Sequence, residues 1–229
     1  DLLGPGGARN KGVKITKFEN LIFFDADVII KENTIKNLLE NLKNNHAVVG
    51  MYSFKSVSKG LFQELKAKYY YRMLYMDGNN YPYSIFSASC SAIKKKVFED
   101  VKGYDQWFGN NKIDYENEDL GLRIKNKYKI ILCPKAQVDH NFPNTKKILK
   151  TLFFRTSHWV EFFYYIKRNF DEAGGTKLRG LKCYLSLINL LSVVFLFIPK
   201  YSIITITITI INFLINYDFL RFFYKNSYI

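Results

Sequence analysis

Apolar and polar positions along the chain follow two different periods. Helical spacing predicts helices over residues 33–42 and 61–75, and the first of these carries Asn33 as a candidate N-cap. Between and after the helices lie short apolar runs typical of strands. These runs cover residues 20–24, 47–52, 84–93 (a strand and turn), 128–133 and 136–140. The alternation predicts an α/β fold.

The C-terminal third has a different pattern. Residues 145–168 combine basic and aromatic side chains, as helices at a membrane interface do. Two uncharged stretches follow, Cys183–Pro199 and Tyr201–Tyr217, each near the minimum length for a membrane span. Basic residues on both outer flanks favour a hairpin that turns at Pro199 and leaves both ends in the cytosol. One span plus an interfacial segment is the alternative.

The alternation of Ile and Thr from Ile204 to Thr209 would suit a strand in water. An isolated strand in lipid leaves its backbone groups unpaired, so we expect a helix there.

Composition narrows the class of protein. The chain has 229 residues, 48% of them hydrophobic, and a formal net charge of +14. A charge of this size suggests nucleic acid or anionic lipid as a partner. The basic residues are scattered lysines without a nucleic-acid motif, so we expect membrane lipid and no nucleic acid. Cys90 and Cys133 lie in apolar surroundings and are predicted to be buried free thiols.

The first chemical feature is Asp25-Ala26-Asp27, which follows an apolar run. In an extended chain, two residues spaced by two point to the same face. Paired carboxylates are costly without a cation, which suggests a divalent metal with a phosphate ligand. Solvated acids at the end of a strand are the alternative.

A glycine-rich turn and helix start precede this tripeptide, at Gly4-Pro5-Gly6-Gly7-Ala8-Arg9-Asn10-Lys11-Gly12. The ordered set of glycine-rich turn, Ala-Arg-Asn helix and strand into Asp-Ala-Asp resembles the family 2 glycosyltransferases. The resemblance implies a GT-A fold, which is Rossmann-like with a mixed sheet. It also implies that Arg9, Asn10, Asp25 and Asp27 bind a nucleotide-sugar donor. The two aspartates would hold Mn²⁺ or Mg²⁺ against the donor diphosphate.

The sequence starts without Met, inside this helix turn. The resemblance therefore leads us to expect that the first strands of the nucleotide-binding half, which read the donor base, precede it.

A second part of the resemblance is Lys94 to Asp105, a helix ending in Gly-Tyr-Asp. In the family this element precedes a loop of catalytic acids. Residues 87–92 would then line the acceptor site, and an ordinary strand of small residues is the equal alternative.

The acid loop itself is Glu116-Asn117-Glu118-Asp119, followed by Leu120 and Arg123. The family usually has a general-base Asp where this chain has Asn117, and an amide cannot accept a proton at neutral pH. Three interpretations remain: Glu116, Glu118 or Asp119 supplies the base, the enzyme uses a retaining route, or activity is lost. We favour the first. For Asp119, a simple helical pair with Arg123 is the competing interpretation.

The resemblance also implies that His140, at the end of a strand, completes the metal shell, although a lone His is as often structural. Arg155 and Trp159 loosely match an Arg-Trp element of processive members, in which the Arg meets the diphosphate. The Gln of that element is absent, since Leu152 stands there.

These inferences predict three regions: a GT-A domain over residues 1–143, an interfacial segment over 144–182 and a transmembrane hairpin with a tail over 183–229. The predicted function is metal-dependent transfer of a sugar from a nucleotide-sugar to a glycan or lipid-linked acceptor. The catalytic domain is expected in the cytoplasm, at the membrane. The alternative is a non-catalytic membrane protein that keeps the fold as a sugar- or nucleotide-binding module.

Overall fold

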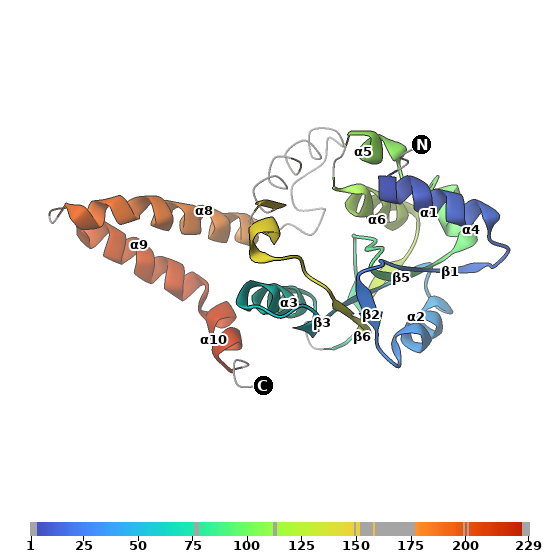
Figure 1. Ribbon diagram of the computed structural model, residues 1–229, viewed down its shortest axis with the longest axis horizontal. Coiled ribbons are helices and arrows are strands. Elements are labelled where there is room, and N and C mark those ends of the chain that lie inside the picture. Colours follow the sequence, from blue (N-terminus) through green and yellow to red (C-terminus); the bar gives the residue numbers. More distant parts are fainter. Residues whose placement is uncertain are drawn as a thin grey trace. The chain divides into compact units, whose positions relative to one another are not determined.

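The computed structural model describes residues 4–75, 78–111, 114–148, 150–151, 158, 177–198, 200 and 202–225. The chain divides into two compact units, one up to residue 169 and one from residue 170. The first unit contains a mixed sheet with helices on both faces, which confirms the α/β class (Figure 1).

The strands of the first unit are β1 (Asn20–Phe24), β2 (Val28–Ile30), β3 (Ala47–Ser56), β4 (Tyr81–Pro82), β5 (Cys90–Lys94) and β6 (Ile130–His140). The helices are α1 (Gly4–Ile15), α2 (Thr34–Leu42), α3 (Leu61–Leu74), α4 (Lys95–Asp100), α5 (Gln106–Asn111) and α6 (Glu116–Lys127).

The sheet order is β1-β5-β3-β6-β2, and β4 also pairs with β6. Among the strands that the structure describes, β3 and β6 form the one parallel pair, and the other pairs are antiparallel. β1 and β2 stand at opposite ends of this order, yet residues 25–27 alone connect them. The sheet therefore bends sharply, and the pairing of β3 with β6 shifts register at two points to allow the bend.

Alternating side chains of the strands fill two cores on opposite faces of the sheet. Ala47, Val49 and Ile93 pack with residues from α1, α4 and α6. Val48 and Ala92 point the other way, toward Leu38 of α2 and its neighbours. This separation follows from the period of two along a strand.

Two predicted elements differ from the structure. Residues 84–89 are irregular, and β5 begins only at Cys90, because the N–H of Phe86 donates to the carbonyl of Asn117 instead of to a strand. The two strands predicted on either side of Pro134 form a single strand, β6. Residues 133–136 make no register pair with β3 or β4, as expected near a residue without an N–H.

On α2, Leu38 and Leu42 are buried, whereas Ile35 and Leu39 are exposed. Asn33 occupies the predicted N-cap position, but its side chain makes no capping hydrogen bond.

The second unit contains α8 (Lys177–Ser192), the 3₁₀ helix η1 (Val193–Phe197), α9 (Ser202–Ile215) and α10 (Tyr217–Lys225). The helical state of residues 204–209 agrees with prediction. The predicted spans Cys183–Pro199 and Tyr201–Tyr217 are corrected: in the part of the chain that the structure describes, none of the helices has both the length and the apolar character needed to cross a membrane. The first stretch tightens into η1 after Ser192, and α9 ends at Ile215.

The close approach of α6 to residues 84–86 can be tested at Gly121. A Cβ there would meet the nitrogen of Phe86 and the oxygen of Ser84 at 2.5 Å. We expect Gly121→Ala to lower the free energy of unfolding by about 2–3 kcal/mol, because backbone atoms cannot give way easily.

The matched control is Gly12→Ala in α1, where an added Cβ meets nothing within 4 Å. This change is expected to raise stability by about 0.5–1 kcal/mol, because alanine has less freedom to lose in a helix. Urea unfolding of both variants measures the difference, and equal effects would contradict the packing described for α6.

Candidate active site

The candidate site lies where β1 and β6 end. Asp25 follows β1 directly, and His140 is the last residue of β6. Residues 26–27 form a turn, so the tripeptide is not extended as the sequence pattern suggested. The carboxylates of Asp25 and Asp27 consequently engage different partners, Arg9 and His140.

Arg9, on α1, is the central cation of the site. Its Nη2 donates to Oδ1 of Asp25 at 2.7 Å, and its Nη1 lies 3.7 Å from Oε1 of Glu116. The guanidinium carbon lies 5.3 Å from the ring centre of Tyr104, a cation–π contact. Arg9 therefore joins the Asp-Ala-Asp turn to the start of α6. Its Nη1 is buried and makes no hydrogen bond.

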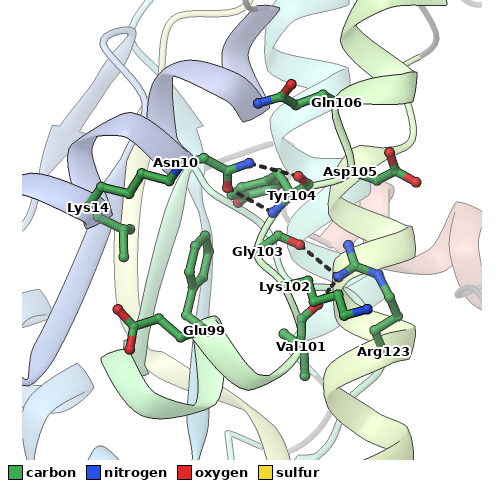
Figure 2. Close-up of a pocket in the computed structure, with 12 residues that line it drawn as sticks. Asn10, Lys14, Glu99, Val101, Lys102, Gly103, Tyr104, Asp105, Gln106 and Arg123 are labelled. Carbon is green, nitrogen blue, oxygen red and sulfur yellow. Dashed lines mark hydrogen bonds between the residues drawn. The ribbon is translucent and has the colours of Figure 1, made fainter.

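Asn10 fixes the neighbouring loop. Its Nδ2 donates to the carbonyl of Tyr104 at 2.8 Å, and its Oδ1 accepts from the N–H of Tyr104 at 2.9 Å (Figure 2). This pair of hydrogen bonds to the backbone of Tyr104 uses both the donor and the acceptor of the Asn10 amide. Asn10 thus acts on the site through Tyr104, and the structure shows it holding α1 to the Gly-Tyr-Asp loop.

Beside this contact lies a cavity of about 630 Å³, shown in Figure 2. Its lining includes Asn10, Lys14, Lys102, Tyr104 and Arg123. Sequence reasoning did not single out this cavity, because its walls come from α1, the end of α4, the loop after it and α6.

Asn117 has a structural role that the sequence did not reveal. Its Oδ1 accepts from the N–H of Ala88 and from the hydroxyl of Tyr104, each at 3.4 Å, and its carbonyl accepts from Phe86 at 3.0 Å. An aspartate here would offer the same acceptor geometry. Asn117 therefore fixes the small-residue segment that was predicted to line the acceptor site.

The three acidic candidates of the loop are not equivalent. Glu116 lies beside Arg9. Asp119 is buried and accepts from Nε and Nη2 of Arg123 at 2.9 and 2.5 Å. Arg123 also donates to the carbonyls of Gly103 and Val101 (Figure 2). The Asp119–Arg123 pair therefore ties α6 to the loop after α4. Glu118 lies partly buried in the first turn of α6.

His140 is packed between aromatic rings. Its ring centre lies 4.7 Å from that of Tyr52 and 4.4 Å from that of Phe142. Its Nε2 lies 3.5 Å from Oδ2 of Asp27. Burial lowers the pKa of His140 below its usual value, and this effect outweighs the nearby Asp27 carboxylate, which raises the pKa. A neutral imidazole, the form that binds metals, is therefore favoured at pH 7.

Tyr52, on β3, belongs to the site although the sequence pattern did not mark it. Its hydroxyl forms a hydrogen bond with Ser89, and burial raises its pKa. The charges of Asp25 and Asp27 raise this pKa further. The one feature of the sequence that could have marked Tyr52 as a site residue is its position at the end of the predicted strand 47–52.

The sequence predicts Asp25, Asp27 and His140 as metal ligands. Asp27 and His140 converge, whereas Asp25 is held by Arg9. Within the described residues, no three His, Cys, Asp or Glu side chains form a group able to hold a metal ion. Mg²⁺ and similar cations are often bound by one or two protein ligands, with water and substrate phosphate completing the shell. Asp27 and His140 fit that kind of site.

Arg155 and Trp159, the loose match to processive members, lie outside the described residues. Cys90 and Cys133 are buried free thiols, as predicted, and burial raises the pKa of Cys90 to about 12.

The fold and site together define a class: a mixed α/β domain with charged side chains gathered at the carboxyl ends of two strands. Residues 2–102 match the family model described as Glycosyl transferase family 2. The match confirms, for this part of the chain, the resemblance to family 2 glycosyltransferases, and with the mixed sheet it supports a GT-A-like fold.

Similar solved structures include GalNAc-T7 with UDP, GalNAc and Mn²⁺, with a TM-score of 0.45 and 16% identity over 62% of this chain. Residues 1–349 of TarS from S. aureus align with a TM-score of 0.42 and 16% identity over 60% of this chain. A longer TarS structure aligns with a TM-score of 0.41 and 13% identity over 82% of this chain. This chain spans 31%, 40% and 31% of their respective lengths. No curated protein matches it by sequence.

The role of Asp119 as a structural anchor predicts a stability effect. Asp119→Asn removes a charge that Arg123 binds in a buried position, and we expect a loss of about 2–3 kcal/mol of unfolding free energy. The control is Asp100→Asn, which removes an exposed partner of Lys127 at 3.2 Å. Urea unfolding should show no measurable change for this control, because solvent screens the pair. A stable Asp119→Asn variant would contradict the anchoring role.

Proposed function

We propose that this protein transfers a sugar from a nucleotide-sugar donor to a hydroxyl of a glycan or lipid-linked acceptor. One observation carries the proposal: in a chain whose residues 2–102 match a glycosyltransferase family, Arg9 joins Asp25 to Glu116 beside the Asp27–His140 pair. This arrangement combines an anion-binding group, Arg9, with a carboxylate beside it, Glu116. Both are required for displacement of a nucleoside diphosphate by a hydroxyl.

Arg9 is the proposed contact for the donor diphosphate. Guanidinium groups bind phosphate oxygens in pairs of hydrogen bonds, and Nη1 of Arg9 is buried without one. A phosphate oxygen near Nη1 would satisfy this atom and compete with Glu116 for the guanidinium. Donor binding would then release the Glu116 carboxylate for reaction.

Asp27 and His140 are the proposed ligands of a divalent cation such as Mn²⁺ or Mg²⁺. When bound, the cation would supply positive charge to the diphosphate as it leaves. Asp25, which Arg9 holds in place, would orient the guanidinium rather than bind the cation directly.

Glu116 is the proposed general base. In the proposed step, the acceptor oxygen bonds to the anomeric carbon, and the bond from that carbon to the diphosphate oxygen breaks. The leaving diphosphate takes the electron pair, and the hydroxyl proton passes to Glu116. Asp119 is engaged by Arg123, and Asn117 cannot accept the proton, so Glu116 suits this task best.

The base is tested by Glu116→Gln, assayed with UDP- and GDP-sugars in the presence of Mn²⁺. We expect kcat to fall about 10²–10⁴-fold, because the amide cannot take the proton, while donor binding is retained. Glu118→Gln is the control of equal charge change and should stay within about threefold of the unaltered protein. If Glu116→Gln keeps the kcat of the unaltered protein, Glu116 is not the general base.

A non-catalytic binding module is the second candidate, and Asn117 is the observation that favours it. If the protein is such a module, the unaltered protein would bind a sugar nucleotide but would neither transfer nor hydrolyse the sugar, whichever metal ion is added. Asn117→Asp then becomes the informative variant, because it places a carboxylate between Ala88 and Tyr104 without changing shape.

The donor contact is tested separately by equilibrium binding of UDP with and without Mn²⁺. Arg9→Ala is expected to weaken binding about tenfold or more in both conditions, because a charge-assisted contact is lost. Asp27→Asn should weaken binding only in the presence of Mn²⁺. Equal losses with and without metal for Asp27→Asn would overturn its assignment as a cation ligand.

A further inference from the structure

Among the residues that the structure describes, the side-chain hydrogen bonds between α8 and α9 join polar residues, whereas most large apolar side chains of the hairpin are exposed. Three pairs of polar residues connect the helices in antiparallel register. Ser186 pairs with Asn212 at 3.3 Å, Thr209 donates to Oδ1 of Asn189 at 2.9 Å, and Thr205 donates to the carbonyl of Ser192 at 2.5 Å. We call these six residues the polar ladder.

The innermost pair is the most enclosed, with Ser192 and Thr205 each only 3% exposed. Large apolar side chains of the same helices point outward. Leu190 is 69% exposed, Leu191 65% and Ile203 68%. Leu187, Ile206, Ile210, Phe213 and Leu214 of these helices are also exposed, as is Val194 of η1.

This distribution is the reverse of that in a water-soluble helix pair, where the apolar stripe faces inward. Helices in lipid gain nothing from burying leucine against each other, and they associate through small residues and interhelical hydrogen bonds. Ser, Thr and Asn on the ladder fit this rule. The exposed apolar area on both helices is of the kind that marks a binding surface.

We propose that the α8–α9 hairpin is embedded in the lipid of a membrane that contains anionic headgroups, with the polar ladder as its internal contact. The charge distribution supports lipid as the occupant. Residues 173–217 contain no Asp or Glu but include Lys177, Arg179, Lys182 and Lys200. Lys177 is the first residue of α8, and Lys200 lies between η1 and α9, so cations occur at both ends of this arm and the hairpin lies along the surface at headgroup depth.

A second copy of this chain is the competing occupant. A dimer contact would need one apolar stripe, whereas here exposed apolar side chains occur along both α8 and α9. The inference does not depend on the proposed transfer reaction, and the test uses binding alone.

The test is co-sedimentation of the purified protein with phosphatidylcholine vesicles, with and without phosphatidylglycerol. We expect the protein to bind both kinds of vesicle, and to bind the anionic vesicles more strongly at low salt. At high salt some binding should remain, because burial of apolar side chains in lipid is not screened by salt. Leu190→Ala combined with Leu191→Ala should weaken binding about tenfold, since this change keeps helix propensity and adds no charge. Leu190→Glu should weaken it further.

The control is Ile15→Glu, at a position in the first unit that is 78% exposed. It makes the same chemical change outside the hairpin and should leave vesicle binding unchanged. Circular dichroism confirms that each variant keeps its helices.

Three outcomes would overturn the proposal. One is an unaltered protein that stays in the supernatant with every vesicle. Another is a loss of vesicle binding in Ile15→Glu as large as that in Leu190→Glu. The last is a stable dimer without lipid that the double alanine variant breaks, which would assign the surface to a second copy.

Discussion

The candidate site depends on the guanidinium of Arg9, which lies between the carboxylates of Asp25 and Glu116. Asp25 and Glu116 come from segments far apart in the sequence, and Arg9 lies within salt-bridge distance of both. Without the guanidinium, two partly buried negative charges would face each other across the site, at a cost that grows as water is excluded. Tyr104 beneath the guanidinium and Asn10 beside it then fix α1 against the loop before α5. The geometry proposed for donor binding follows from this contact.

A second constraint is the short connection from β1 to β2. Three residues join strands at opposite ends of the sheet order, so the sheet bends and the ends of β1 and β6 come together. The bend brings His140 to Asp27, and it also places Tyr52 of β3 against the imidazole. The turn that separates the two aspartates is therefore a consequence of the fold. Because of this turn, the carboxylate of Asp25 pairs with Arg9 and that of Asp27 faces His140.

Asn117 shows how a departure from a family pattern is to be interpreted. From the sequence it indicated a missing base. In the structure its amide oxygen accepts two hydrogen bonds that organise Ala88 and Tyr104, and Glu116 one residue earlier stands beside Arg9. A position can thus lose a proton acceptor while it keeps the acceptor geometry that its neighbours need.

The sequence by itself determined the α/β class, most of the helices and strands, the burial of Cys90 and Cys133, and the motifs that match glycosyl transferase family 2. These features are local, because periodicity and turn residues act over a few positions. The tertiary structure decided the rest. It divided Asp25 from Asp27, brought Arg123 to the carbonyls of Val101 and Gly103, and turned the polar face of α8 toward α9. Such pairings depend on which segments meet in space, and no local pattern contains that information.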